Sequence, residues 1–505
     1  MLSLLIFFPL VAALIIWLGC QRQPALARSL TLGAVVVESI IVAWMFTSGH
    51  VHGFSMTERL NWISDFGIQY LVSIDGISLS MIGLSCALFL VSILTAWNHV
   101  DRWNAFGPLM LATLGGIVGA FLALDLLLFY VFWELMLIPI YFMLSFWGSK
   151  GSKKAAMKFM LVTIAGSLLM LVSLIALYLV HGNQTGNYTF DYFALANHPL
   201  VMHGAIYILA GFLIAFLIKV PGFPFHFWAP DTYREGNPAV VMLLSGVMAN
   251  VGAYGILRFC LAIFPQAMHQ LTDVGMALGA LGTLYGAFLA FRQSDLRSVI
   301  AYSSVSHMNL VVMAIFALQL QALNGAVLQL VAHGLSVAGL FAVVGMLQAR
   351  GFQGEMKGMG GLYKVIPGIG IFLVFLVAAS VGVPGLANFA GEILLLVGSF
   401  TTNPVWASVA AFSILFGVVY FLKAYGRSML GPISDEVQAR TITDLNAREK
   451  MIAAVLVIGL FWVGVDPNYL LQMMAQSTSQ LIAATSPSVI TVTHAIVKGV
   501  IYVAP

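Results

Sequence analysis

The sequence is poor in charge. Charged residues make up only 8% of its 505 residues, whereas 61% are hydrophobic and the mean hydropathy is +0.98. A soluble domain carries about 25% charged residues, so this chain lacks the polar side chains to cover a surface that faces water. Apolar runs of about 20 residues, each long enough to cross a bilayer, recur along the chain. Such continuous runs predict an all-α polytopic membrane protein with the lipid bilayer as its main surroundings.

Cysteine and nucleotide-binding motifs are also scarce. The three cysteines, Cys20, Cys86 and Cys260, lie far apart, so they do not form the closely spaced set of thiolates that an iron–sulfur cluster needs. We find no Walker loop, no dinucleotide fingerprint after a strand, no metal motif and no hydrolase triad. The basic residues form no stripe for nucleic acid. The sequence therefore predicts no cofactor or metal on this chain and no nucleic-acid partner.

Fourteen membrane spans are expected, with the first retained as a helix rather than removed as a signal peptide. Lysine and arginine gather in alternate loops, which places those loops in the cytoplasm and both termini on the outer side. We expect the tail after residue 475 to lie along the surface or to form a partial helix. The expected spans are 2–19, 28–47, 76–97, 107–123, 126–147, 156–180, 203–220, 238–262, 273–291, 297–317, 320–347, 368–398, 405–430 and 451–470.

Two spans carry the same interruption. Span 7 ends in Lys219-Val-Pro-Gly, and span 12 contains Val-Pro-Gly shortly before Glu392. Proline breaks the helical ladder, and the five-span separation gives the two units opposite orientations. Interrupted helices in inverted halves indicate a transport site near the bilayer midplane. The alternative is two ordinary membrane-helix prolines.

The predicted units are helices 1–3 (1–105), two inverted five-helix repeats (106–264 and 265–432) and a last part with a loop, helix 14 and the tail (433–505).

Ionisable side chains within the apolar spans are the candidate functional residues. Each costs roughly 2.5–3.5 kcal/mol at the bilayer centre, so they must face the interior, pair or meet water. Glu134 and Lys219 are a natural ion pair, and His307, His333 and Glu392 could continue a proton relay. Each histidine could instead have a structural role and form a hydrogen bond between two helices. Asp125, near the start of span 5, is more easily explained as structural.

These residues stand in recognisable motifs. They are Phe-Trp-Glu134-Leu-Met-Leu-Ile-Pro, Lys219-Val-Pro-Gly-Phe-Pro-Phe-His226, Tyr-Gly-Ile-Leu-Arg258, Ser-Ser-Val-Ser-His307, Ala-His333-Gly-Leu-Ser and Gly-Glu392. Over nearly its whole length the chain resembles the antiporter-like membrane subunits of bacterial respiratory complex I, the NADH–quinone oxidoreductase, and the M type more than the L and N types.

The resemblance implies two inverted five-helix repeats with broken helices 7 and 12. It places Glu134 and Lys219 in an input half-channel and Glu392 at the outlet, and it adds His226 to the candidate residues. It further implies a bacterial inner-membrane location and neighbours of the L and N types. NADH, FMN, iron–sulfur clusters and quinone would be held by partner subunits.

Two positions depart from the family pattern. Asn250 stands where the family usually has a lysine that carries protons between the halves, and the segment after His226 lacks the usual second histidine. Asparagine can hold water in line but cannot titrate. Three hypotheses therefore stay open. They are an M-type pump or a divergent paralogue of one, a subunit of a related cation/proton antiporter, membrane hydrogenase or ion-coupled uptake complex, and a scaffold that no longer pumps.

Overall fold

A computed structural model describes residues 1–49, 51, 53–200 and 204–485. Within these ranges, eleven helical segments are long and apolar enough to cross a membrane. They are α1 (Leu2–Gly19), α2 (Pro24–Thr47), α3 (Gly76–Ala96), α4 (Trp103–Leu122), α5 with α6 (Leu126–Leu135, Leu137–Trp147), α7 (Ser152–Thr185), the segment from α11 to α13 (Pro238–Ile263), α15 (Thr272–Arg292), α16 (Leu296–Phe316), α17 (Leu320–Ala349) and α20 (Pro404–Met429).

The remaining predicted spans, 7, 12 and 14, are shorter or broken helices. Span 7 is α9 (Ala205–Lys219), which ends at the predicted Pro-Gly interruption. Span 12 is divided into α18 (Pro367–Ser380) and α19 (Ala387–Thr402). Span 14 is α22 (Ala447–Val465), which meets α23 (Pro467–Ala484) at a bend of 69°. The chain is an all-α polytopic membrane protein with helices 7 and 12 broken, while the part of the expected tail at 486–505 lies outside the described residues.

The segment from α11 to α13 contains two π-helical turns. They are η3 (Leu244–Met248) and η4 (Ile256–Cys260), and they flank α12 (Ala249–Gly255). A π-turn inside an α-helix holds one residue more than an α-turn and is often found at functional sites. Asn250 lies between the two wide turns.

A β-hairpin joins α2 to α3 and was not predicted. Its antiparallel strands are β1 (Ser55–Ile63) and β2 (Ile68–Ile74), linked by the 3-10 turn η1 (Ser64–Phe66). Gly67 adopts the left-handed conformation that ends this turn. In the sequence this segment is only a connection between two spans, because its strands are too short to cross the bilayer as helices.

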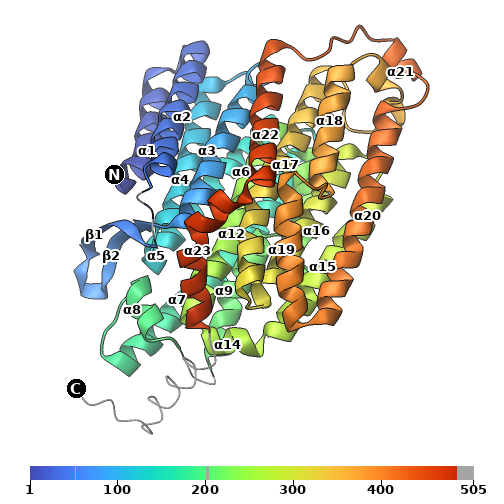
Figure 1. Cartoon of the computed structure of the whole chain (residues 1–505). Coiled ribbons are helices and arrows are strands. Elements are labelled where there is room, and N and C mark those ends of the chain that lie inside the picture. The colour runs from blue at the N-terminus through green and yellow to red at the C-terminus, as the bar shows by residue number, and fades with distance from the viewer. Residues whose placement is uncertain (50, 52, 201–203, 486–505) are drawn as a thin grey trace.

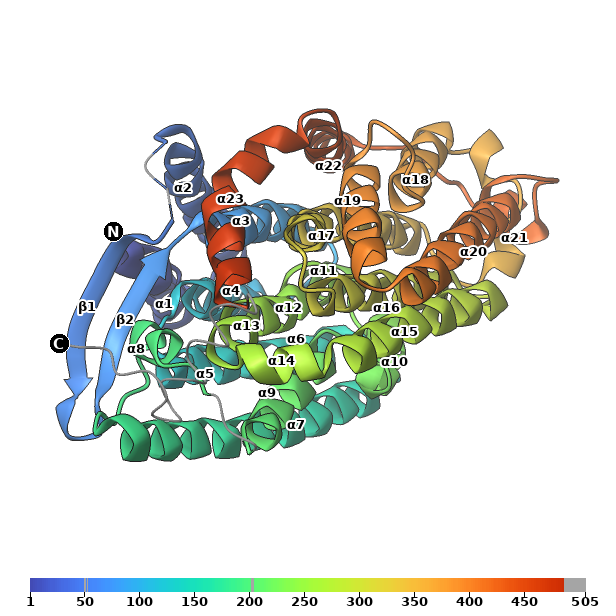
Figure 2. The same ribbon diagram turned by 60° about the horizontal axis from the view of Figure 1, so that its bottom comes forward.

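The bundle is elongated, with α1 and α2 at one side and α20 at the other (Figure 1). Helix α17 is buried across its full membrane window and lies between these two sides. The hairpin lies on the side of α1, near α8 (Tyr192–Asn197) (Figure 2). Shorter helices complete the chain: α10 (Ala229–Glu235), α14 (Pro265–Gln270), α21 (Asp435–Gln438) and the 3-10 turns η2 (Phe225–Trp228), η5 (Met356–Gly358) and η6 (Leu362–Lys364).

Candidate functional site

Lys219 is the last residue of α9, immediately before the broken part of span 7. Its side chain is 1% exposed, and Nζ has no hydrogen-bond partner within the described part of the chain. The ammonium lies 4.4 Å from the centre of the Trp133 ring. A cation over the face of an indole is attracted by the ring quadrupole, so Trp133 partly compensates the buried charge.

Glu134 follows Trp133 near the end of α5. The direct ion pair with Lys219 that the sequence suggested is not formed, since none of the ion pairs found within 4.0 Å among the described residues joins these two side chains. The two groups are still close enough to interact electrostatically, and Glu134 Oε1 is buried without a hydrogen-bond partner in the described chain. The aromatic ring of Trp133, rather than the carboxylate, is in contact with the ammonium.

Asn250 connects two helices at the centre of the bundle. Its Nδ2 donates to the carbonyl of Gly246 at 3.0 Å and to that of Leu330 on α17 at 3.1 Å. The side chain is 0% exposed, and Oδ1 is buried without a partner among the described residues. Two residues further on, Gly252 packs closely on α9, where a Cβ would meet the Phe216 carbonyl and the side chains of Val220 and Lys219. Helix α12 therefore lies between α9, which ends at Lys219, and α17.

The second half contains a continuous set of contacts from α16 to α19. His333 Nε2 lies 3.0 Å from Ser304 Oγ, and the His333 and His307 rings stack with their centres 5.4 Å apart. His307 Nδ1 lies 3.3 Å from Glu392 Oε1. Gln329 Nε2 donates to the same carboxylate at 3.5 Å. Glu392 also lines a small pocket together with His307 and residues of α15, α18 and α20.

Two of the predicted residues have different surroundings. Asp125 caps α5, accepting from the backbone amides of Leu127 and Leu128, and a third bond from the Gln69 amide fixes the hairpin to this helix. These three bonds explain the buried carboxylate as a structural cap. His226 is buried beside the rings of Phe223 and Tyr285.

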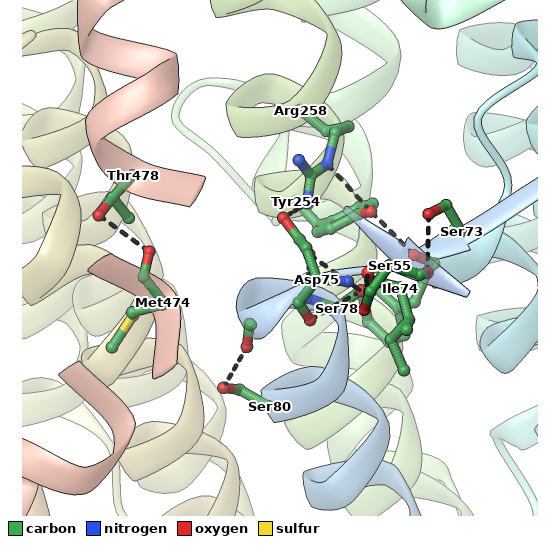
Figure 3. Close-up of polar contacts among 12 residues, drawn as sticks. Ser55, Ser73, Ile74, Asp75, Ser78, Ser80, Tyr254, Arg258, Met474 and Thr478 are labelled. Carbon is green, nitrogen blue, oxygen red and sulfur yellow. Dashed lines mark hydrogen bonds and ion pairs between the residues drawn. The ribbon is translucent and has the colours of Figure 1, made fainter. Parts of the chain in front are cut away.

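Three buried charged groups were missed as site residues. Asp75 and Arg258 form an ion pair in which each side chain is 1% exposed. Figure 3 shows this pair with Tyr254, whose hydroxyl accepts from Arg258 Nε at 3.2 Å, and with Ser78, which Asp75 caps. Glu38, on α2, is also 1% exposed. A charge in an apolar run could have indicated Glu38 and Arg258, and an Asp before a helix could have indicated Asp75 as a cap.

These features define a class. A helical membrane bundle with two broken spans and a buried row of ionisable side chains is typical of a subunit that translocates ions. The family model of the NADH:quinone oxidoreductase/Mrp antiporter transmembrane region matches residues 123–417. The chain belongs to this family.

The relatives extend the match to nearly the whole chain. NADH-quinone oxidoreductase subunit M of Pseudomonas aeruginosa is 37% identical over 94% of this chain and 96% of its own length. Subunit M of Escherichia coli K12 is 35% identical over 93% and 95%. A chain of Thermus thermophilus respiratory complex I superposes with a TM-score of 0.89 at 28% identity, covering 96% of this chain and all of that one. A chain of the Dietzia Mrp complex shares the fold, with a TM-score of 0.86 at 19% identity over 97% and 98%.

Proposed function

We propose that this chain is the M-type proton-translocating membrane subunit of a bacterial NADH–quinone oxidoreductase. The observation that carries the proposal is the buried connection His333–His307–Glu392, in which titratable groups from three helices are in contact at membrane depth. The subunit M names of the relatives at 35–37% identity support the choice of complex. NADH, FMN, the iron–sulfur clusters and quinone then belong to partner subunits, and antiporter-like subunits of the L and N types are the neighbours.

The two halves of the row would perform different tasks. Lys219 would bind a proton at the end of α9, with Trp133 in contact with the ammonium and Glu134 close by. His307 and Glu392 would exchange a proton directly, since 3.3 Å is close to hydrogen-bond distance. Asn250 cannot titrate, so a proton passing between the halves needs water or a moving side chain there. Its unpaired Oδ1 is an acceptor that could orient such a water.

The asymmetry of the basic loops supports both termini on the outer side of the bacterial inner membrane. The β-hairpin would lie on the outer side of the membrane, and the loop between α20 and α22 would face the cytoplasm. The domain division at residues 105, 264 and 432 is part of the same proposal. The boundaries at 264 and 432 fall between helices, whereas the boundary at 105 falls in the first turn of α4.

A second candidate is a subunit of a cation/proton antiporter, which the shared fold with the Mrp chain favours. Gene neighbourhood separates the two, because genes for flavin, iron–sulfur and quinone-site subunits beside this one would support the oxidoreductase. Genes for only antiporter subunits would contradict it.

The third hypothesis, a scaffold that no longer pumps, is tested by Glu134→Gln in the assembled complex. We expect the variant to assemble and to lose most of its quinone-dependent proton translocation, measured as acidification of vesicles. Glu436→Gln, which changes an exposed carboxylate on α21, is the matched control and should pump normally. Unchanged translocation in Glu134→Gln would favour the scaffold.

A further inference from the structure

Glu38 lies in the middle of α2, outside the row of residues described above. Fourteen residues separate it from Pro24, which places it about 21 Å along the helix at 1.5 Å per residue. Its side chain is 1% exposed, and both carboxyl oxygens are buried without a hydrogen-bond partner in the described chain. Because it is covered within this single chain, a neighbouring subunit cannot supply a counter-charge to it.

The surroundings of Glu38 contain no basic partner among the described residues. It belongs to the packed face of α2 with Thr31, Val35 and Val42. Across from it on α3, the Cys86 thiol is close enough to interact with the carboxyl electrostatically. The adjacent Ser39 hydroxyl donates to the Val35 carbonyl at 2.7 Å.

An ionised Glu38 would therefore be an uncompensated charge within the bilayer. Burying a carboxylate without a partner is so costly that such a group normally takes up a proton instead. A neutral carboxylic acid at this depth keeps one exchangeable proton. The environment thus favours the acid form of Glu38. Glu392 differs in that its carboxyl group has two partners, His307 and Gln329.

One polar residue on the buried face of α2 lies between Glu38 and the basic end of the helix. Thr31 lies seven residues, or about 10 Å, toward that end on the same buried face. Its hydroxyl donates to the Ala27 carbonyl at 2.8 Å and keeps its lone pairs free to accept. Gly107 on α4 leaves room for this hydroxyl, because a Cβ there would clash with it. Arg28 lies at the basic end of α2 and donates to the Trp97 carbonyl at 3.0 Å.

Helix α3 separates Glu38 from the row on α9, α12 and α16 to α19. Cys86 faces α2, whereas Leu88, two residues later, contacts the position of Gly246 in the π-turn before Asn250. We propose that Glu38 is a second proton-binding site of this subunit, which holds a proton at neutral pH and exchanges it with water through the basic end of α2. The proposal concerns the resting complex and does not depend on whether the subunit pumps.

Infrared difference spectroscopy of the purified complex at neutral pH tests this site. We expect wild type to show a carbonyl band of a protonated carboxylic acid that Glu38→Gln lacks and that shifts in D₂O. Cys86→Ser should move the same band, because a hydroxyl is a stronger hydrogen-bonding neighbour than a thiol. Glu436→Gln, at an exposed carboxylate, should leave the band unchanged.

Two results would overturn the proposal. If no acid band is lost in Glu38→Gln, the side chain is ionised and the inferred state is wrong. If the band is present but fails to shift in D₂O, the acid is sealed in static packing and binds no exchangeable proton. Should Glu38→Gln fail to assemble, Cys86→Ser and Thr31→Val decide the matter, since the first must move the band and the second must slow its shift.

Discussion

His307 and Glu392 belong to different helices, α16 and α19, and meet at 3.3 Å between Nδ1 and Oε1. The other partner of the His307 ring is His333, which stacks on it from α17. His307 thus has a carboxyl group on one side and a second imidazole on the other. It is the middle member of the three, in contact with both of the others.

Glu392→Gln is the sharpest test of this set. The amide keeps the shape of the side chain but cannot bind or release a proton, and we expect proton translocation to fall by about tenfold or more, the order expected when an acid–base group is removed. Vesicle acidification driven by NADH oxidation provides the measurement. Ile393→Val, at a neighbouring exposed apolar position, is the control. Normal pumping by an assembled Glu392→Gln complex would remove Glu392 from the pathway.

Asn250→Lys tests the departure from the family pattern. We expect this variant to insert and assemble, because the carbonyl oxygens of Gly246 and Leu330, which now accept from Asn250 Nδ2, can accept from an ammonium instead. Asn250→Ala loses two hydrogen bonds to carbonyls, which destabilises the protein by about 1 kcal/mol for each bond. Thermal unfolding in detergent ranks the variants. A lysine variant that is less stable than the alanine variant would show that the surrounding pocket has been rebuilt.

The buried pair of Asp75 and Arg258 predicts a strong effect on stability. Removing one partner of a buried ion pair leaves an uncompensated charge and costs about 3–5 kcal/mol. We expect Asp75→Asn or Arg258→Met to lower the unfolding temperature markedly, and the double variant to recover part of the loss. A double variant whose loss equals the sum of the single losses would show that the two side chains do not interact.

His99, in the loop between α3 and α4, gives a pH dependence. Partial desolvation by the surrounding protein, together with the charges of Arg448 and Arg350, lowers the pKa of His99 below its usual 6.5, although Glu449 acts in the opposite direction and the side chain remains exposed. The unfolded loop then binds a proton more readily than the folded one, so the stabilisation is complete above pH 6.5 and decreases as the pH falls below it. The hydrogen-exchange protection factors of residues 97–102, which are corrected for the intrinsic dependence of exchange on pH, should fall from pH 7.5 to 5.5 in wild type. In His99→Gln the part of this fall due to the imidazole should be absent, and an identical fall in both proteins would contradict the assignment.

The sequence was sufficient for the helices and the breaks because both have local causes. Length and apolarity predict a span, and Pro221 or Pro384 predicts an interruption in the span that contains it. The contacts between helices were less accessible. His307 and Glu392 are 85 residues apart, so their separation of 3.3 Å is a property of packing and not of a motif.

Other contacts were not predictable because two kinds of neighbour compete for one side chain. The expected pairing of Glu134 with Lys219 rested on opposite charges alone, whereas in the structure the ammonium lies over the ring of Trp133. Glu38 satisfied the same criterion as Glu134, a charge within an apolar span, but no interruption or motif stood beside it. The hairpin was missed because strands of nine and seven residues are too short for a search tuned to membrane-spanning helices.

The two π-turns that flank Asn250 give the segment from α11 to α13 more residues than a regular α-helix of the same length. Each stores one additional residue, and if either turn migrated past α12, the side chains between would rotate by about 100° while both ends of the segment stayed fixed. Such a slip is enough to point the Asn250 amide away from Leu330 and toward a different neighbour. The two turns therefore allow the register of α12 to change by one residue without any displacement of the ends of the span.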